Sequence, residues 1–472
     1  MSTATALAPA GPARRAAAHR ALSTTRTLAR LEVRHLLTNA WLWCALAVGV
    51  AVPALITLRT PQRAEWAYDT QLAGTGLLLP ALALMATAGL AAQRERRNHL
   101  PETLAALPAS VSARTLATAF AHMAVALVTT LVPLAAFLLW RHLVAAPQAG
   151  VPDVAALWCV PAGALLLVAL GIALGCFFTS PLVFPASVFV LLVLLANQAT
   201  PLWPLPLTSL LSGTTALWPG LSRLLYLLVA VLLLLVLALS RHRRSGPRTA
   251  TAALALLGLV PLALTGSAAA RRQADDPHRT CTAHHGVTYC HFDGFAPWIP
   301  LWAAAAEPVR GAVPGPFRAA FPTLTQYRTT LNGTAPGAMG TQWATADRQV
   351  SDRGTLAGRL AATTVGLAPD SACDATGQAR TVLALYLTGH AVPLPERVVW
   401  DPDEDLTLLG RLTYTQTELA LARQALAAPG TPARVADHWA ALVRPDATTD
   451  DAAKLLGLNP TAPQPPSGKA CA

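Results

Sequence analysis

The sequence predicts a mostly α protein, in which a polytopic α-helical membrane domain precedes a mixed α/β extracytoplasmic domain. Only 12% of the 472 residues are charged and 53% are hydrophobic, whereas soluble domains average about 25% charged residues. Long apolar segments fill the first 268 residues, and charged and polar residues return after them. The arginines of the first part flank these apolar segments, as is typical of membrane proteins.

Seven apolar segments are predicted to cross the membrane, because a hydrocarbon core of about 30 Å needs roughly 20 helical residues. Only Thr179–Pro181 separate the fourth segment from the fifth, which predicts a tight hairpin. A signal peptide is not predicted, because no short apolar core precedes a small-residue cleavage site. The seven segments are Trp41–Leu58, Leu72–Ala92, Thr115–Trp140, Val154–Phe178, Leu182–Ala196, Leu221–Ser240 and Thr251–Ser267.

The distribution of arginine predicts the orientation of these spans. All but two of the 35 basic residues are arginines, and this bias, with abundant Ala and Pro, suggests a GC-rich bacterial source. If the N-terminus is cytoplasmic, fourteen arginines lie in cytoplasmic segments and four in or beside external loops. Positive charge favours the cytoplasmic side, so we expect a plasma-membrane protein with residues 269–472 outside. The four external arginines are Arg59, Arg63, Arg141 and Arg223.

The chain therefore divides into five predicted parts. These are a cytoplasmic segment (1–40), a six-span domain (41–245), a seventh span (246–268), an extracytoplasmic domain (269–458) and a disordered, proline-rich tail (459–472). Leucines 22, 28, 31 and 36 fall near one helical face, which favours an interfacial helix before the first span. The alternative is a solvated basic tail.

The extracytoplasmic domain combines short strands with amphipathic helices. The stretches "GVTYCHF", "TVLALYLTG" and "RVVWDP" predict strands, whereas "TYTQTELALARQALA" and "PARVADHWAALVR" predict helices.

The sequence lacks the common motifs for nucleotide binding, zinc-dependent hydrolysis and serine hydrolysis. The sequence has no G-x-x-x-x-G-K-[ST], no H-E-x-x-H and no G-x-S-x-G. No Asp, Glu or Lys falls inside the seven segments, although ion-coupled transporters usually need such groups. His122 is interpreted as a helix-packing hydrogen bonder rather than a proton relay. We predict no cofactor and no enzymatic activity in this chain, and no nucleic-acid partner, because no basic stretch is interleaved with aromatics.

The charged stretch "RERRNHLPETLAALPASVSARTLA", residues 94–117, lies on the predicted cytoplasmic side. Pro101 can open a short helix with Glu102 in its first turn, and Pro108 can close it. Ser110 or Ser112 can then cap the helix of the next span. Such a short surface helix can enter a groove of a cytoplasmic partner. The alternative is an ordinary positively charged loop.

This stretch resembles the first cytoplasmic loop of type-2 ABC transporter permeases. The matching residues are Glu95, Glu102, Thr103, Leu104, Leu107, Pro108, Ser110 and Arg114. The interfacial helix and the tight hairpin are also similar to that family, and the resemblance covers about residues 20–245. It implies an exporter in which two permease subunits, identical or different, lie in lipid and bind two soluble ATPase subunits. The expected ATPase-coupling residues are Glu95, Arg96, Glu102, Thr103, Leu104, Leu107, Pro108 and Arg114.

Two features depart from the family pattern, which has six spans and no large external domain. The seventh span, after "RHRRSGPR", is interpreted as the tether of the external domain. One alternative is a membrane-anchored extracellular binding or sensing protein. Another is a membrane-tethered hydrolase, which would need side chains such as His284, His285, Asp293, His390 and His438 to converge.

The cysteines divide between the two sides of the membrane. Cys44, Cys159 and Cys176 fall in spans, whereas Cys281, Cys290, Cys373 and Cys471 fall outside, where disulfides form. The stretch "CTAHHGVTYCH" predicts a Cys281–Cys290 disulfide. The alternative is a metal site made from Cys281, His284, His285, Cys290 and His291. A Cys373–Cys471 bond is a weaker possibility.

Overall fold

The computed structural model divides into two compact units. The first comprises Met1–Ile56, Ala67–Leu143 and Pro152–Ala274, and the second comprises Thr57–Trp66, Val144–Val151 and Asp275–Ala472. We call the first the membrane unit, after its apolar helices, and the second the outer unit, after its predicted location outside the membrane. The structure describes residues 12–59, 66–97, 110–144, 149–152, 154–196, 220–240, 279–326, 338–339, 346–368, 374–398, 408–409 and 412–459.

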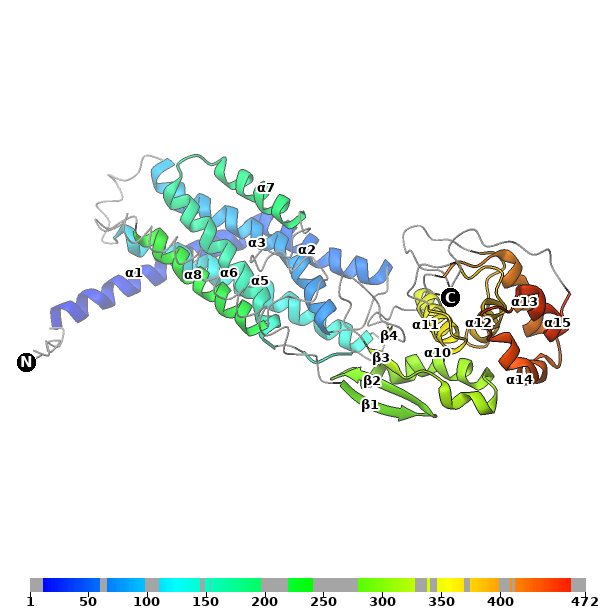
Figure 1. Ribbon diagram of the computed structural model, residues 1–472. Helices are drawn as coiled ribbons and strands as arrows, with labels where there is room; N and C mark the ends of the chain where they lie inside the picture. Colours follow the sequence, from blue (N-terminus) through cyan, green and yellow to red (C-terminus); the bar gives the residue numbers. More distant parts are fainter. Residues whose placement is uncertain are drawn as a thin grey trace, which may run out of the picture. The chain divides into compact units, whose positions relative to one another are not determined.

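The membrane unit is a bundle of helices (Figure 1). Its elements are α1 (Pro12–Leu37), α2 (Ala40–Arg59), α3 (Trp66–Arg97), α5 (Val111–Val144), α6 (Val154–Phe177), α7 (Val183–Ala196) and α8 (Gly220–Ser240). Four of these, α2, α3, α5 and α6, are long and apolar enough to cross a membrane. They correspond to the first four predicted spans.

The later predicted spans are described only in part. Helix α7 is described over 14 residues, and α8 contributes the shorter apolar stretch Leu224–Ser240. The predicted seventh span lies outside the described residues, so the total of seven stays a prediction. The predicted tight hairpin is present, because α6 ends at Phe177 and α7 begins at Val183.

Helix α6 is the most buried of the four long helices, with 72% of its apolar window inside the protein against 22% for α2. Glycines allow it to approach α3 closely. A Cβ atom on Gly171 would lie 2.1 Å from the Met85 carbonyl oxygen, and one on Gly175 would lie 2.4 Å from that of Gly89. Gly171 and Gly175 form a G-x-x-x-G pattern, which brings helix backbones together in membranes.

A buried ion pair joins α3 to α5. The Nε of Arg141 lies 2.9 Å from Oδ1 of Asp69, and the two side chains are 6% and 1% exposed. Asp69 lies in the first turn of α3 and Arg141 in the last turn of α5. The helix dipole stabilises a negative charge at the first position and a positive charge at the second. The prediction that Arg141 lies in a loop is thereby wrong, because α5 continues beyond its apolar segment to Val144. Asp69 precedes the predicted span Leu72–Ala92, which has no acidic residue.

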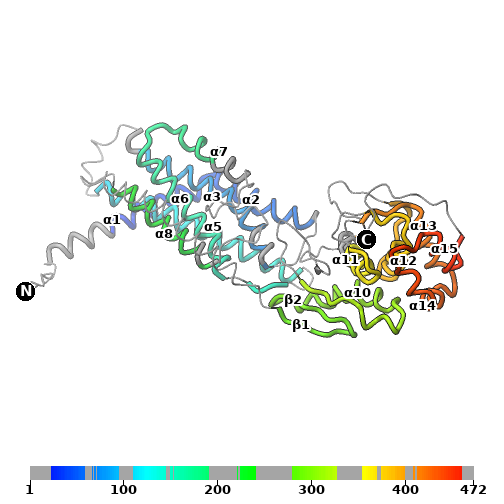
Figure 2. Tube along the Cα trace, in the orientation of Figure 1, coloured from blue at the N-terminus to red at the C-terminus, as the bar shows by residue number. Residues whose placement is uncertain are grey.

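The outer unit begins with a small sheet of order β1-β2-β3-β4. Strands β1 (Arg279–His284) and β2 (Val287–Phe292) form an antiparallel hairpin, which confirms the strand predicted for "GVTYCHF". Strands β3 (Leu324–Gln326) and β4 (Ala338–Met339) add in parallel. Helix α10 (Ile299–Ala312) follows the short helix η2 (Ala296–Trp298), packs against β2 (Figure 2), and precedes η3 (Gly315–Ala320).

Helix α12 (Ala379–Gly389) is the centre of the outer unit. It contacts α10, α11 (Ala346–Thr364), α13 (Gln416–Ala427), α14 (Thr431–Leu442) and α15 (Thr449–Leu456). Every residue from Ala379 to Thr388 is buried. The predicted strand "TVLALYLTG" is therefore wrong, because an apolar run surrounded by helices on all sides has no periodicity to distinguish it from a buried strand.

The two helices predicted near the C-terminus are confirmed as α13 and α14. Of "RVVWDP", Arg397 and Val398 are not in a strand, and the remaining four residues lie outside the described ranges. So does the predicted disordered tail, apart from Asn459.

Residues 149 and 150, from the connection between α5 and α6, belong to the outer unit. The amide of Gly150 donates to the Gly294 carbonyl at 3.0 Å, and the amide of Trp66 donates to the Ala149 carbonyl at 3.1 Å. Gly294 has φ +81°, and a Cβ there would lie 2.6 Å from the carbonyl carbon of Gly150. Glycine is therefore required at 294 by both conformation and space.

The close packing of α3 and α6 makes Gly171 intolerant of even one methyl group. We expect Gly171→Ala to lower the free energy of unfolding by about 1–3 kcal/mol, because the Met85 backbone cannot yield as a flexible side chain would. Gly163→Ala, in the same helix, is the matched control, because a Cβ there meets no atom within 4 Å. Thermal unfolding in detergent measures both, and equal melting temperatures for the two variants would contradict the packing argument.

Candidate functional site

The predicted coupling residues fall at the junction between α3 and α5. Glu95 and Arg96 lie in the last turn of α3, where only the backbone is described, and Arg114 lies in the first turn of α5. The remaining five lie outside the described residues: Glu102, Thr103, Leu104, Leu107 and Pro108. The structure therefore describes the two helices on either side of the predicted coupling segment, and not the segment itself.

Ser110 begins helix α5, as the sequence predicted. Its Oγ accepts a hydrogen bond from the amide of Ala113 at 3.2 Å, and the amide of Arg114 donates to the Ser110 carbonyl at 3.1 Å. The Oγ of Ser112 lies 3.1 Å from that of Ser110. A side-chain oxygen at this position satisfies an amide that the helix leaves free.

Helix α1 contacts the end of α3 that leads into the predicted coupling segment. Nη1 of Arg94 lies 3.0 Å from Oε1 of Glu32, and the side chain of Leu36 is buried in the membrane-unit core. Arginines 26, 30 and 34, spaced four residues apart, are exposed on another face of α1. Of the predicted leucine stripe, Leu28 is half-buried and Leu36 is buried, but Leu31 is 57% exposed and lies off this face.

A cavity of about 250 Å³ with a mixed polar and apolar lining lies between α1, α3 and α5. It is lined by Glu32, His35, Leu36, Asn39, Thr87, Leu90, Ala91, Arg94 and His122. The Nδ1 of His122 bonds to the Thr118 carbonyl at 2.9 Å, as expected for a helix-packing histidine. Its buried Nε2, however, has no hydrogen-bond partner among the described residues, and neither has the buried Oε2 of Glu32.

Gln93, which the sequence analysis did not select, connects α3 to the α6–α7 turn. Its Nε2 donates to the carbonyls of Phe178 at 2.9 Å and Ser180 at 3.3 Å. Gln93 is 1% exposed and directly precedes Arg94. The last turns of α3 therefore contact α1 through Arg94 and the α6–α7 turn through Gln93, so a displacement of this end would reach both.

In the outer unit, the predicted Cys281–Cys290 disulfide is present. The two residues are directly opposite in the β1–β2 pairing, and by loop entropy such a bond contributes roughly 2–3 kcal/mol of stability. The alternative metal site with Cys281 and Cys290 as ligands is therefore excluded in this form. Cys373 and Cys471 lie outside the described residues.

The histidines of that alternative site divide into two groups. His284 and His285 both contact Glu307 of α10, at 2.9 and 2.8 Å between Nδ1 and Oε1. His291 is instead buried, with Nδ1 bonded to the Phe292 carbonyl at 2.9 Å. Partial burial acts to raise the pKa of Glu307, but the hydrogen bonds from His285 and His284 outweigh it and hold this pKa below its ordinary value.

The side chains named for a hydrolase do not form one group in the part of the chain that the structure describes. Asp293 follows β2, His390 follows α12 and His438 lies on α14. Among the described residues, the group of His, Cys, Asp or Glu side chains close enough to share a metal ion is His284, His285 and Glu307. Glu307 could not be found from local spacing, because it follows the histidines by more than 20 residues.

Comparisons of the chain with protein-family models, with curated proteins and with solved structures found no match.

The Asp69–Arg141 and Glu32–Arg94 ion pairs should differ sharply in their contribution to stability. Asp69→Asn leaves the Arg141 charge buried without its partner, and we expect a loss of about 3–5 kcal/mol. Glu32→Gln removes a pair whose arginine is 46% exposed, and we expect a loss of about 0–1 kcal/mol. Unfolding of both variants in the same detergent measures the difference, and a similar loss in both would show that burial does not govern these pairs.

Proposed function

We propose that this protein is the membrane-spanning permease subunit of an ABC-type exporter, energised by a separate soluble ATPase. The proposal rests on the resemblance of residues 94–117 to the coupling loop of type-2 permeases. In it, the segment 101–108 enters a groove of the ATPase, and two permease subunits form the path through the lipid. The chain itself supplies no ATP hydrolysis.

The contacts of helix α3 are the observation that best supports this proposal. A coupling segment must be connected to elements that move together, and α3 meets both α1 and the α6–α7 turn just before the coupling segment begins, through the Arg94–Glu32 pair and the Gln93 hydrogen bonds. At the other end of the segment, α5 is capped at Ser110 and continues for 34 residues to Val144. A push on the segment would therefore be transmitted along two continuous helices.

The proposed topology is supported by which segments of the chain make up the outer unit. Segments 57–66 and 144–151, both predicted to be external loops, belong to the same compact unit as residues 275–472. The Gly150–Gly294 hydrogen bond requires its two residues to be on one side of the membrane. The Cys281–Cys290 disulfide favours an oxidising compartment for that unit.

A membrane-anchored binding or sensing protein is the second candidate function. It is favoured by the outer unit, which has its own hydrophobic core around α12 and an exposed histidine-rich turn. In this alternative the membrane helices anchor the outer unit and no ATPase binds.

The topology predicts opposite labelling of the two ends of the chain. An engineered cysteine at Asp437, exposed on α14, should react with a membrane-impermeant maleimide in intact cells. A cysteine at Thr27, exposed on α1, should react only after lysis. Both are made in a background with Cys44, Cys373 and Cys471 replaced, since Cys44 is exposed and the other two are predicted to be external. Labelling of the Asp437 position only after lysis would contradict the proposed orientation.

The coupling segment predicts a specific loss of ATPase binding. Leu104→Asp, and separately Glu102→Lys, should reduce co-purification of an ATPase encoded beside this protein by roughly tenfold, because a charge in an apolar groove or a reversed charge opposes docking. Val151→Asp adds the same charge to an exposed position of the outer unit and should leave recovery unchanged. All variants are compared at equal levels in the membrane.

The recovered ATPase also discriminates between the two candidate functions. If wild-type protein and Leu104→Asp recover equal amounts, the segment is not the coupling site. If neither recovers any ATPase, the exporter proposal is wrong and the anchored binding protein is favoured.

A further inference from the structure

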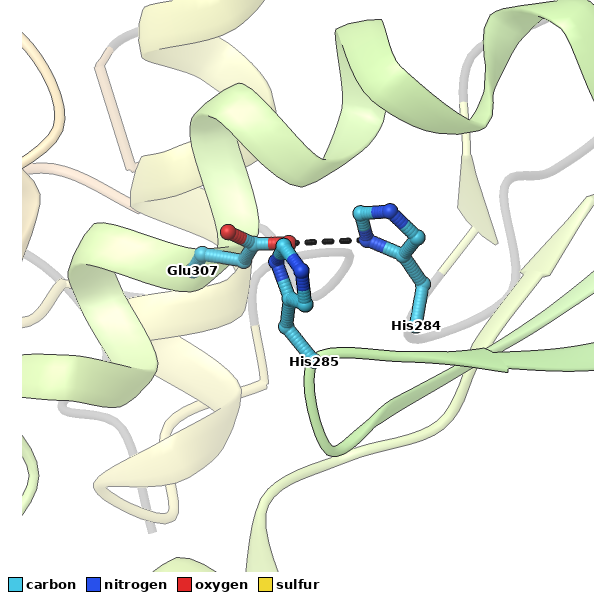
Figure 3. A group of neighbouring side chains, drawn as sticks. All are labelled: His284, His285 and Glu307. Atoms are coloured by element: carbon cyan, nitrogen blue, oxygen red, sulfur yellow. Dashed lines mark hydrogen bonds and ion pairs between the residues drawn. The ribbon is translucent and has the colours of Figure 1, made fainter.

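The hairpin turn of the outer unit brings two consecutive histidines to one carboxylate. Both His284 and His285 point toward Glu307 of α10 (Figure 3), and their Nδ1 atoms lie 2.9 and 2.8 Å from the same oxygen, Oε1. The two imidazole rings are 4.1 Å apart between centroids. One ligand atom from each of the three residues lies within 4.8 Å of the others.

This convergence depends on an unusual backbone conformation. Successive side chains of a strand point to opposite faces, so two adjacent histidines would normally separate. Here His285 has φ +47° and Gly286 has φ +78°, and this two-residue turn redirects His285 to the side of the sheet that faces α10. Among the described residues, His285 is the one non-glycine with positive φ, a conformation in which histidine is more frequent than most residues.

The surroundings hold the turn in place but leave the three side chains accessible. Nη1 of Arg310, one turn after Glu307, donates to the His285 carbonyl at 3.4 Å, and the Cys281–Cys290 disulfide closes the hairpin behind the turn. The ring of buried Tyr289 lies edge-on to His284, with 6.4 Å between centroids. The side chains are 38% (His284), 69% (His285) and 31% (Glu307) exposed.

The donor set matches the preference of zinc. Two imidazole nitrogens and one carboxylate oxygen form a ligand set found in proteins with three-ligand zinc sites, where a fourth position stays open for water. With zinc–ligand bonds of about 2.0–2.1 Å, tetrahedral donors lie about 3.3 Å apart. The observed separations of 2.8 and 2.9 Å need to open by only about half an ångström.

We propose that His284, His285 and Glu307 bind a divalent transition-metal ion, Zn²⁺ in the first place. The ion replaces the hydrogens that now bridge each Nδ1 to Oε1, and it joins the hairpin turn to α10. The nearby positive charge of Arg310 opposes the binding of a cation. The negative charge of the Glu307 carboxylate offsets it and makes cation binding favourable. This site does not depend on the exporter proposal, since it uses only residues of the outer unit.

The test is metal binding by the full-length protein, purified in detergent through a tag without histidine and stripped with chelator. Zn²⁺ is titrated by calorimetry, and Co²⁺ by its visible absorption, which reports coordination geometry. Three variants remove one ligand each and preserve the local fold: His284→Thr suits a strand, His285→Asn tolerates positive φ, and Glu307→Gln keeps the shape. His438→Ala and Glu396→Gln are matched controls outside the group.

Wild-type protein should bind one equivalent that is lost or weakened by a factor of roughly 10 to 100 in each ligand variant, with Glu307→Gln the weakest. Both controls should bind as the wild type does. An intact disulfide and an unchanged melting temperature without metal establish that the variants are folded. Equal binding by wild type and all three ligand variants, or no binding by the folded wild type, would overturn the proposal.

Discussion

The close approach of α3 and α6 is the constraint on which the membrane unit depends. Helices in lipid gain little from the hydrophobic effect when they associate, so backbone proximity and van der Waals contact must supply the attraction. Gly171 and Gly175 provide that proximity on α6, and Gly49 and Gly76 provide it where α2 meets α3. Once α3 is held against α2 and α6, its two ends are positioned for polar contacts: Asp69 with Arg141 at one end, and Gln93 and Arg94 at the other.

Hydrogen bonding of buried polar groups is uneven within the described part of the membrane unit. Several described polar side chains form hydrogen bonds within their own helix. The hydroxyls of Thr129 and Thr130, for example, donate to the carbonyls of Val125 and Ala126, four residues earlier. At the end of the bundle near α1, in contrast, Glu32 and His122 keep buried unpartnered atoms beside a cavity. Unsatisfied buried groups are costly, and in the described part of this unit that cost falls near the end of α3 that precedes the predicted coupling segment.

The outer unit is built differently, around one extensive hydrophobic core. Its centre is the buried helix α12, and the buried side chain of a glutamate forms hydrogen bonds to several segments around this helix. Glu418, 1% exposed, accepts hydrogen bonds from the amides of Gly377 and Thr415 and from the hydroxyl of Thr449. It therefore connects α13 to α15 and to the segment just before α12. The sheet lies apart from this polar centre and is closed by the disulfide, which leaves its turn free to present His284 and His285.

Features set by neighbours in the sequence could be predicted from the sequence by itself. These are the first four apolar helices, the Ser110 cap, the α6–α7 turn, helices α13 and α14, and a disulfide between cysteines nine positions apart. Features set by distant residues were decided by the tertiary structure. Arg141 pairs with an aspartate 72 positions away, Glu307 joins histidines 22 and 23 positions away, and "TVLALYLTG" is a helix because five other helices enclose it. Local periodicity does not show which distant group will neutralise a charge or cover an apolar face. That pairing is fixed only when the chain packs into its tertiary structure.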